Sequence, residues 1–170
     1  MKKALITIGI IILIAIVLQT LGISVPHYLT PKKDIETSEL NQPSLEKKVL
    51  VASRSSDFKN AVLDKIKEEF NGDSVYIKFT GLKKLHGEDI GPYNVFVLIN
   101  TCMAGSMDPV VKGFAQKQKD GKIIVLTTSG DGVWLPKIKD RSLDAVATAS
   151  KKDKTGSVAK EIIDKIRASL

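Results

Sequence analysis

Near the middle of the chain lies an uninterrupted apolar segment, Val95-Phe96-Val97-Leu98-Ile99. A second segment of this kind, Ile123-Ile124-Val125-Leu126, follows it after one predicted helix. Short runs that are apolar on both faces are typical of strands buried inside a parallel sheet. Helices that alternate with such strands cover both faces of the sheet. The two segments therefore predict an α/β fold built as a three-layer sandwich.

The flanking segments extend this pattern to a five-stranded parallel sheet. Residues 75–79 alternate between apolar and polar-tipped side chains, which is typical of an edge strand. If this second strand lies at the edge, right-handed crossovers give the order 2-1-3-4-5, which is the flavodoxin-like order. We predict strands at residues 49–52, 75–79, 95–99, 123–126 and 143–147, and helices at residues 57–70, from 109 onward, and at about 157–168.

The amino terminus begins with Lys2-Lys3 and continues as an uncharged run over residues 4–25. As a helix this run would reach roughly 33 Å, about the thickness of a bilayer core. A retained transmembrane anchor and a cleaved signal peptide both fit this pattern. We expect the anchor, because the run is longer than the roughly 7–15-residue core of a signal peptide. The two lysines predict a cytoplasmic amino terminus and a body outside the cytoplasm.

Residues 26–46 have three prolines, scattered charge and no hydrophobic period, so they are predicted to be a linker. The sequence thus predicts three parts. These are a transmembrane anchor over residues 1–25, a linker over residues 26–46, and a flavodoxin-like domain over residues 47–170.

Composition limits the chemistry. The single cysteine excludes an intramolecular disulfide and a cysteine-rich metal cage, and the only histidines, His27 and His86, lie far apart. We therefore expect no metal site. The formal charge of +7 comes from lysines spread over predicted helices, without the aromatic-interleaved stripe of a nucleic-acid site. We expect no nucleic-acid partner and a mild attraction to anionic lipid headgroups.

Three loops follow the inner strands and are the candidate sites. The first, Ser53-Arg54-Ser55-Ser56-Asp57, opens a helix, so it is either a phosphate cradle or an ordinary N-cap by Ser55 or Ser56. The second covers residues 100–107 and holds Cys102, which is either part of a site or a small buried residue. The third covers residues 127–134, and its Trp134 is either a cofactor platform or a lid over the core edge.

From Lys48 onward the chain resembles the flavodoxin-like flavoprotein superfamily. Gly105-Ser106-Met107, with Lys112 and Phe114 behind it, is similar to the segment that borders the flavin ring in flavin reductases of that fold. Ser129-Gly130-Asp131, with Trp134 three residues on, is similar to the flavodoxin segment whose aromatic residue stacks on the isoalloxazine. Residues 53–56 take the place of the family's phosphate loop.

The resemblance implies FMN as cofactor, a role in electron transfer or flavin-dependent oxidation and reduction, and a redox partner protein. It assigns no catalytic residue. The residues that it implies for cofactor binding come from the three loops and are Ser53, Ser55, Ser56, Thr101, Cys102, Met103, Ser129, Gly130, Asp131 and Trp134.

Two departures from the family pattern support a second hypothesis. Ser56 and Phe58 replace the glycine and the threonine of the phosphate loop, and Met103 and Ala104 replace the usual aromatic residue of the second loop. The alternative is a cofactor-free, flavodoxin-like interaction module at the membrane. The phosphate-loop departures favour this alternative, whereas the segment that ends in Trp134 favours FMN.

Overall fold

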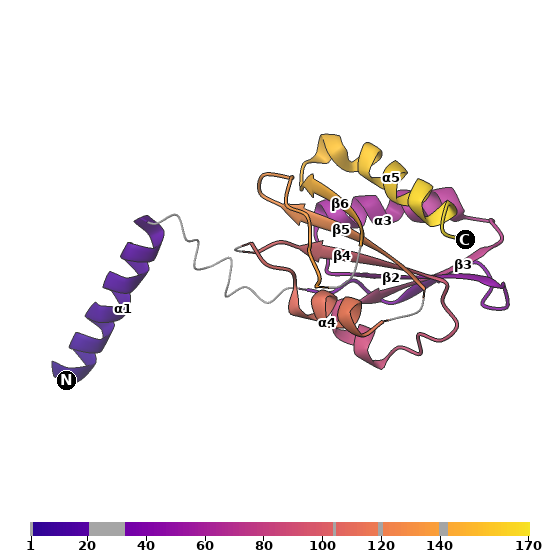
Figure 1. Ribbon diagram of the computed structural model, residues 1–170. Coiled ribbons are helices and arrows are strands. Elements are labelled where there is room, and N and C mark those ends of the chain that lie inside the picture. Colours follow the sequence, from indigo (N-terminus) through magenta and orange to yellow (C-terminus); the bar gives the residue numbers. More distant parts are fainter. Residues whose placement is uncertain (1, 21–32, 104, 119–120, 140–142) are drawn as a thin grey trace. The chain divides into compact units, whose positions relative to one another are not determined.

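The computed structural model describes residues 2–20, 33–103, 105–118, 121–139 and 143–170 (Figure 1). The chain divides into two compact units, Met1–Lys32 and Lys33–Leu170. The second unit contains the whole sheet and all the candidate site residues.

The described part of the first unit is the helix α1 (Lys2–Thr20), which is 19 residues long. Its uncharged part begins at Ala4 and rises roughly 25 Å, less than the hydrocarbon core of about 30 Å. Within the described residues, no helix is long and apolar enough to cross a membrane. The predicted transmembrane helix is therefore wrong, and so is the membrane location deduced from it. The prediction had continued the helix to residue 25, whereas residues 21–32, which include the start of the predicted linker, lie outside the described part.

The second unit is built on a six-stranded sheet in the order β1-β3-β2-β4-β5-β6. All neighbouring pairs from β3 to β6 are parallel. The strands are β1 (Ser38–Leu40), β2 (Lys47–Ser53), β3 (Val75–Gly81), β4 (Val95–Thr101), β5 (Lys122–Ser129) and β6 (Asp144–Ala149). The five parallel strands keep the flavodoxin-like order within this larger, mixed sheet.

The prediction of a five-stranded, all-parallel sheet is wrong because of β1. This strand comes from the segment predicted as linker and pairs antiparallel with β3, so that Ser38 lies opposite Phe79. β3 is therefore an inner strand, although its alternating side chains suggested an edge. The Lys78 ammonium group forms an ion pair with the Glu88 carboxylate at 2.5 Å, so the polar end of this side chain has a partner within the protein.

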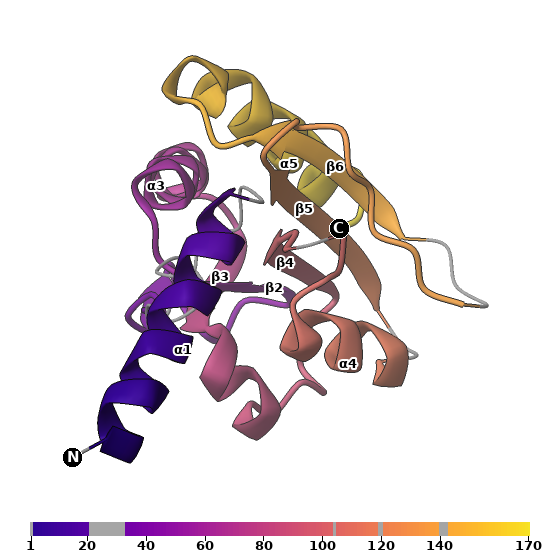
Figure 2. The ribbon, with the colours of Figure 1, turned by 90° about the vertical axis from the view of Figure 1, so that its left-hand side faces the viewer.

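Helices cover both faces of the sheet (Figures 1 and 2). α3 (Asp57–Phe70) and α5 (Thr155–Arg167) lie over one face, and α4 (Pro109–Lys117) lies over the other together with the 3-10 helix η1 (Leu82–Gly87). A second 3-10 turn, η2 (Lys152–Lys154), precedes α5. The chain thus forms the predicted three layers, with η1 in the short connection from β3 to β4.

Local sequence explains these elements. Val97 and Val125 lie on the central strands β4 and β5 and are fully buried, as their apolar surroundings predict. Asp108 caps α4 and Pro109 occupies its first turn, where a missing N–H costs nothing. These elements bring the loops after β2, β4 and β5 to the same edge of the sheet, because parallel strands share their carboxyl ends.

Candidate functional site

The loop over residues 53–57 joins β2 to α3, and the fold itself uses its polar groups. Ser53 is fully buried, and its hydroxyl donates to the Arg54 carbonyl at 2.8 Å. Ser56 is the N-cap of α3, where its hydroxyl accepts the Lys59 N–H at 3.4 Å. Ser56 therefore has the role of an ordinary cap, which is one of the two interpretations of this loop.

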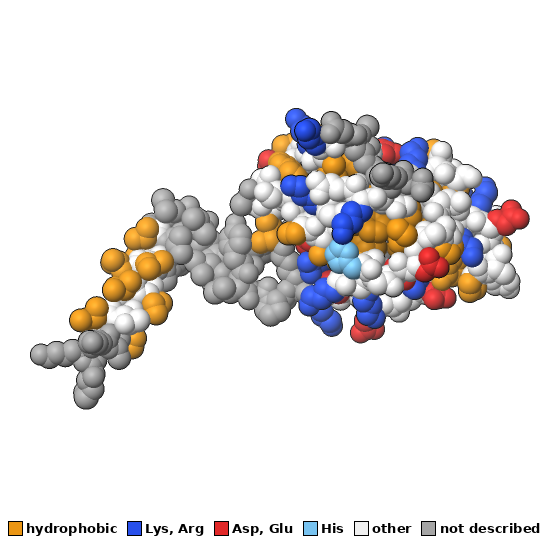
Figure 3. Space-filling model, turned by 60° about the horizontal axis from the view of Figure 1, so that its bottom comes forward, with side chains coloured by type: hydrophobic (Ala, Val, Ile, Leu, Met, Phe, Trp, Pro, Cys, Tyr) orange, Lys and Arg blue, Asp and Glu red, His pale blue; other side chains and the backbone are white. Residues whose placement is uncertain are grey.

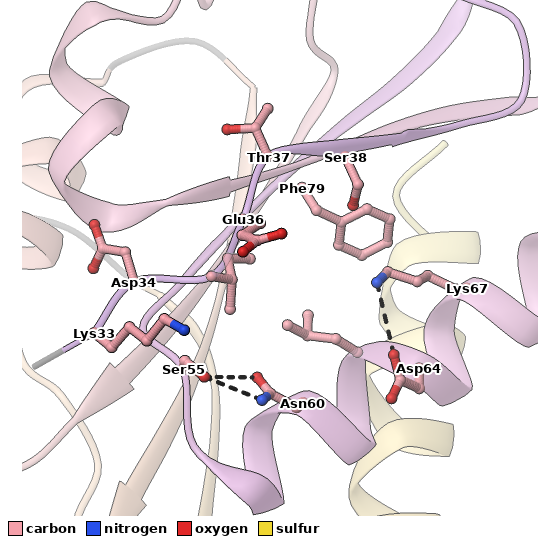
Figure 4. A pocket seen from close by; sticks show the side chains of 12 residues that line it. Lys33, Asp34, Glu36, Thr37, Ser38, Ser55, Asn60, Asp64, Lys67 and Phe79 are labelled. Carbon is pink, nitrogen blue, oxygen red and sulfur yellow. Dashed lines mark hydrogen bonds and ion pairs between the residues drawn. The ribbon is translucent and has the colours of Figure 1, made fainter.

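Ser55 also has partners within the chain. Its N–H donates to the Lys33 carbonyl, with 2.8 Å between N and O, and its hydroxyl oxygen accepts from the Asn60 side-chain amide at 3.1 Å. Figure 4 shows Ser55 and Asn60 pointing toward each other in a cavity of about 440 Å³. Residues 33–38 and α3 form the walls of this cavity, so Ser55 faces the first residues of the second unit.

A buried polar network fills the crevice between β2 and β4. The Arg54 guanidinium pairs with Asp108 through Nε at 2.8 Å and with Asp34 through Nη1 at 3.3 Å. The Asp108 side chain is only 2% exposed, and its carboxylate accepts the Val110 N–H at 3.0 Å. The Asp108 N–H in turn donates to the Asn100 side-chain oxygen at 2.8 Å, and Asn100 is fully buried. The crevice where strand order reverses, the usual ligand position in this fold, is thus closed by side chains.

Thr101, at the end of β4, belongs to the same closed region. Lys59, on α3, is 4% exposed, and its ammonium group donates to the Thr101 hydroxyl at 2.6 Å. The Thr101 hydroxyl, which was predicted to contact a cofactor, therefore accepts a hydrogen bond from the buried Lys59.

These contacts decide whether FMN fits the predicted phosphate loop. A phosphate needs several N–H or hydroxyl donors that point at it. In the loop over residues 53–57 the Ser53 hydroxyl and the Ser55 N–H already donate within the chain, and the Ser56 hydroxyl caps α3 as an acceptor. The Arg54 guanidinium holds two carboxylates. The loop as it stands does not fit the phosphate of FMN.

An open groove lies one strand further along the same edge. It has a volume of about 980 Å³ and separates the loop after β4 from the loop after β5; we call it the carboxyl-end groove. Its lining residues are Gly105, Ser106, Met107, Pro109, Lys112, Asp131, Val133, Trp134, Leu135 and Lys137.

The wall after β4 is a tight turn. Met103 and Ser106 exchange two backbone hydrogen bonds, at 3.1 and 3.0 Å between N and O, and Gly105 has a φ of +70°. The Cys102 N–H donates to the Thr128 carbonyl at 2.9 Å and so continues the pairing of β4 with β5. Neither Cys102 nor Met103 is among the residues that line the groove.

The wall after β5 is held by the Ser129-Gly130-Asp131 turn. The Ser129 hydroxyl donates to the Asp131 carboxylate at 2.7 Å and accepts the Gly132 N–H at 3.0 Å. The Asp131 carboxylate also accepts the Val133 N–H at 3.2 Å. The Ser129 hydroxyl, followed by these backbone groups, lowers the pKa of Asp131, so this groove residue carries a negative charge at neutral pH.

Trp134 lies over the edge of the core and also lines the groove. It packs against the apolar core on the α4 side of the sheet, yet it remains partly exposed and lines the groove. The neighbouring Val133 and Leu135 are 72% and 49% exposed. Together with the buried Met107 they give the groove an apolar surface of a kind that flat ligands and protein partners both bind.

The groove is bordered by positive charge. Lys112 and Lys137 are exposed, and in the part of the chain that the structure describes neither forms an ion pair. Asp131 is the one acidic residue of the lining, so the groove favours anions. On the face that carries α4 and η1, basic side chains lie scattered among apolar ones and form no stripe (Figure 3).

The structure thus separates the predicted site residues into two groups. Of the ten, only Asp131 and Trp134 line the groove, with Ser129 and Gly130 in the turn that supports them. Of the other six, three lie in the loop after β2 and three at the end of β4 or in the turn that follows it: Ser53, Ser55 and Ser56, and Thr101, Cys102 and Met103. The sequence pointed to neither Lys137 nor Leu135, and it named Lys112 only behind the Gly105-Ser106-Met107 segment and not as a binding residue. Lys112 had a usable signal, because it follows the Asp108-Pro109 helix start by one turn, but nothing local marks Lys137.

No cluster of histidine, cysteine, aspartate or glutamate among the described residues could hold a metal ion.

The sequence matches no known protein family, and no curated protein is significantly similar to it. Among solved structures, the chain is similar to rubredoxin oxygen:oxidoreductase from the anaerobe Desulfovibrio gigas, with a TM-score of 0.41 and 15% sequence identity. The similarity covers 76% of this chain and 38% of that protein, so this chain spans well under half of its length. Similarity of this extent does not bear on cofactor or activity, and the flavodoxin-like assignment rests on the strand order itself.

Proposed function

We propose that this chain is a flavodoxin-like domain that binds a flat aromatic ligand with an anionic group, of the FMN class, in the carboxyl-end groove. The observation that carries the proposal is the position of Trp134 and Met107 beside two exposed lysines, in an open groove at the carboxyl ends of β4 and β5. Ligands of open α/β sheets bind at this edge.

Each groove residue has a role in this proposal. Trp134 offers a partly exposed ring for stacking, and its packing against the core fixes the orientation of that ring. Lys112 and Lys137 attract the phosphate, since the Arg54 guanidinium and the Ser55 N–H of the loop over residues 53–57 are already bonded within the chain. Asp131 repels a phosphate from its own side of the groove and so favours one orientation of the ligand.

FMN, when bound, supplies one- and two-electron transfer. The chain itself would bind and orient the ring and exclude water from one of its faces. Electron transfer through the ring to a redox partner protein is the function that this arrangement supports best.

The test uses the fluorescence of Trp134, the single tryptophan of the chain. FMN and riboflavin are each titrated into the full chain, and both are expected to quench Trp134, with FMN binding more tightly. Lys137→Met is expected to weaken FMN about fivefold, the scale of one exposed charge pair, and to leave riboflavin unchanged. Lys139→Met is the matched control, because Lys139 is exposed but does not line the groove.

A second candidate function is a cofactor-free interaction module. The exposure of Val133 and Leu135 beside the groove lysines favours it, since protein interfaces combine apolar anchors with a charged rim. If neither flavin quenches Trp134 or raises the melting temperature at about millimolar concentration, the FMN proposal fails and this candidate replaces it.

A further inference from the structure

The first residues of the second unit lie across the loop that follows β2. We call residues 33–41 the strap. Asp34 and Arg54 form an isolated antiparallel bridge, and their side chains pair at 3.3 Å. The Lys33 carbonyl accepts the Ser55 N–H at 2.8 Å. The strap therefore contacts both the cation and the N–H donor of the loop over residues 53–57.

Close packing against β3 holds the strap in this position. The second oxygen of the Asp34 carboxylate accepts the Lys83 N–H at 2.8 Å. A Cβ atom at Gly81 would lie 2.6 Å from the Asp34 Cβ and 2.8 Å from this oxygen. Asp34 can reach its position only because residue 81 has no side chain.

The far end of the strap is anchored separately. The Asn41 side-chain amide donates to the carbonyls of Phe70 and Val75 at 2.8 and 2.7 Å, and its oxygen accepts the Gly72 N–H at 3.0 Å. Because β1 and Asn41 fix this end to β3, loss of the Asp34 contacts would free residues near 33–37 without detaching the rest of the strap.

We propose that the strap is an autoinhibitory contact. The Asp34 carboxylate binds the Arg54 guanidinium, and the Lys33 carbonyl accepts the Ser55 N–H. These two acceptors take the places that the oxygens of an anionic ligand group would have. A carboxylate on a guanidinium group forms the same charge-assisted bond as a phosphate does. When the strap lifts, the Arg54 Nε stays paired with Asp108, and the Nη1 group that held Asp34 becomes free to donate. The Ser55 N–H also becomes free to donate to a ligand.

This inference rests on the proposed function, because the loop over residues 53–57 then competes for the phosphate of a ligand whose ring lies in the carboxyl-end groove. The two sites are physically connected. Arg54 pairs with Asp108, which caps α4, and Lys112 on the first turns of α4 lines the groove. Release of the strap is therefore expected to increase the contribution of the phosphate to binding and to leave ring binding unchanged.

The test compares Gly81→Ala with Gly87→Ala in the full chain. The first substitution pushes against Asp34, whereas nothing lies within 4 Å of a Cβ at Gly87, which makes Gly87→Ala the matched control. Hydrogen exchange of the Ser55 amide reports strap opening without any ligand and is expected to rise at least about tenfold in Gly81→Ala only. FMN is expected to bind about tenfold more tightly to Gly81→Ala than to the control, and riboflavin equally to both.

A second variant and a second probe keep the test decisive. Asp34→Asn removes the ion pair with Arg54 and fills the same space, so it is expected to act in the same direction if Gly81→Ala fails to fold. Inorganic phosphate at millimolar concentration is expected to shift the Ser55 amide resonance in the strap variants and not in the control. This shift is expected even if no flavin binds, so it separates the autoinhibitory contact from the FMN proposal. Faster exchange at Ser55 with no gain for either phosphate or FMN would overturn the inference.

Discussion

The loop over residues 53–57 and the carboxyl-end groove lie at the same edge of the same sheet, yet they differ in what they offer a ligand. The loop has the fold's usual ligand position, between the carboxyl ends of β2 and β4. Its Ser55 N–H donates to Lys33, and its serine hydroxyls accept from Asn60 and from the first turn of α3. The groove lies one strand further along, and it leaves Trp134 and two lysines accessible.

The difference shows that position in a fold does not by itself make a site. A ligand gains free energy from donors and charges only when they are not already satisfied within the protein. At the loop, a ligand would first have to displace Asp34 from Arg54. At the groove it would displace water.

Breaking the closed region is expected to have the largest effect. Arg54→Met leaves Asp108 almost completely buried without its guanidinium partner, so the free energy of unfolding should fall by about 3 kcal/mol. Urea denaturation followed by circular dichroism measures this change. Lys112→Met in the groove is the matched control and should change stability by less than about 0.5 kcal/mol. Equal losses in the two variants would show that the two regions do not differ in this way.

An intermediate effect is expected at the wall of the groove. Gly132 has a φ of +76°, and a Cβ there would lie 2.5 Å from the Ala149 backbone nitrogen, so Gly132→Ala should cost about 1–3 kcal/mol. The loop should move off β6 and expose Trp134, which shifts its emission to the red. Gly130→Ala is the control, because nothing lies within 4 Å of its Cβ and its φ is not positive. An unchanged emission maximum in Gly132→Ala would mean that this contact does not support the groove.

The smallest effect concerns the charge of the groove. The lowered pKa of Asp131 means that its hydrogen bonds stabilise the fold above the ordinary pKa of an aspartate, and that this stabilisation is lost as pH falls through the folded pKa. Ser129→Ala removes the main cause, so the pKa of Asp131 should rise toward its ordinary value. A carbon-detected NMR titration of the carboxylate measures it. A pKa that stays low in the variant would assign the shift to the backbone donors instead.

Much of the fold follows from local patterns. The apolar runs of β4 and β5, the Asp108-Pro109 helix start and the helical spacing over residues 57–70 each depend on residues close together in the chain. Two predictions failed where a pattern had another cause. The alternating pattern of β3 suggested an edge strand, but β3 is an inner strand whose polar residue Lys78 pairs with Glu88. The predicted helix followed the apolar run at the amino terminus to residue 25, whereas α1 ends at Thr20.

The candidate site was less predictable for a related reason. Hydroxyl-rich residues before a helix are compatible with a phosphate cradle and with an N-cap, and only the partners of Ser55 and Ser56 distinguish the two. Part of the groove lining had a sequence signal, because Asp131 and Trp134 were predicted to bind a cofactor and both line the groove. Lys137 was not predicted, since it lies in an irregular loop without a period.

The sequence by itself determined the layers, the parallel strands and the edge at which the loops meet, because hydrophobic periodicity and helix caps act over a few residues. Only the tertiary structure decided that β1 pairs with β3 and that Asp34 forms an ion pair with Arg54. These contacts join segments far apart in the chain, and their formation depends on the free energy of the whole fold. A pairing of this kind leaves no local signal in the residues that make it, apart from a glycine such as Gly81 whose missing side chain makes room for Asp34.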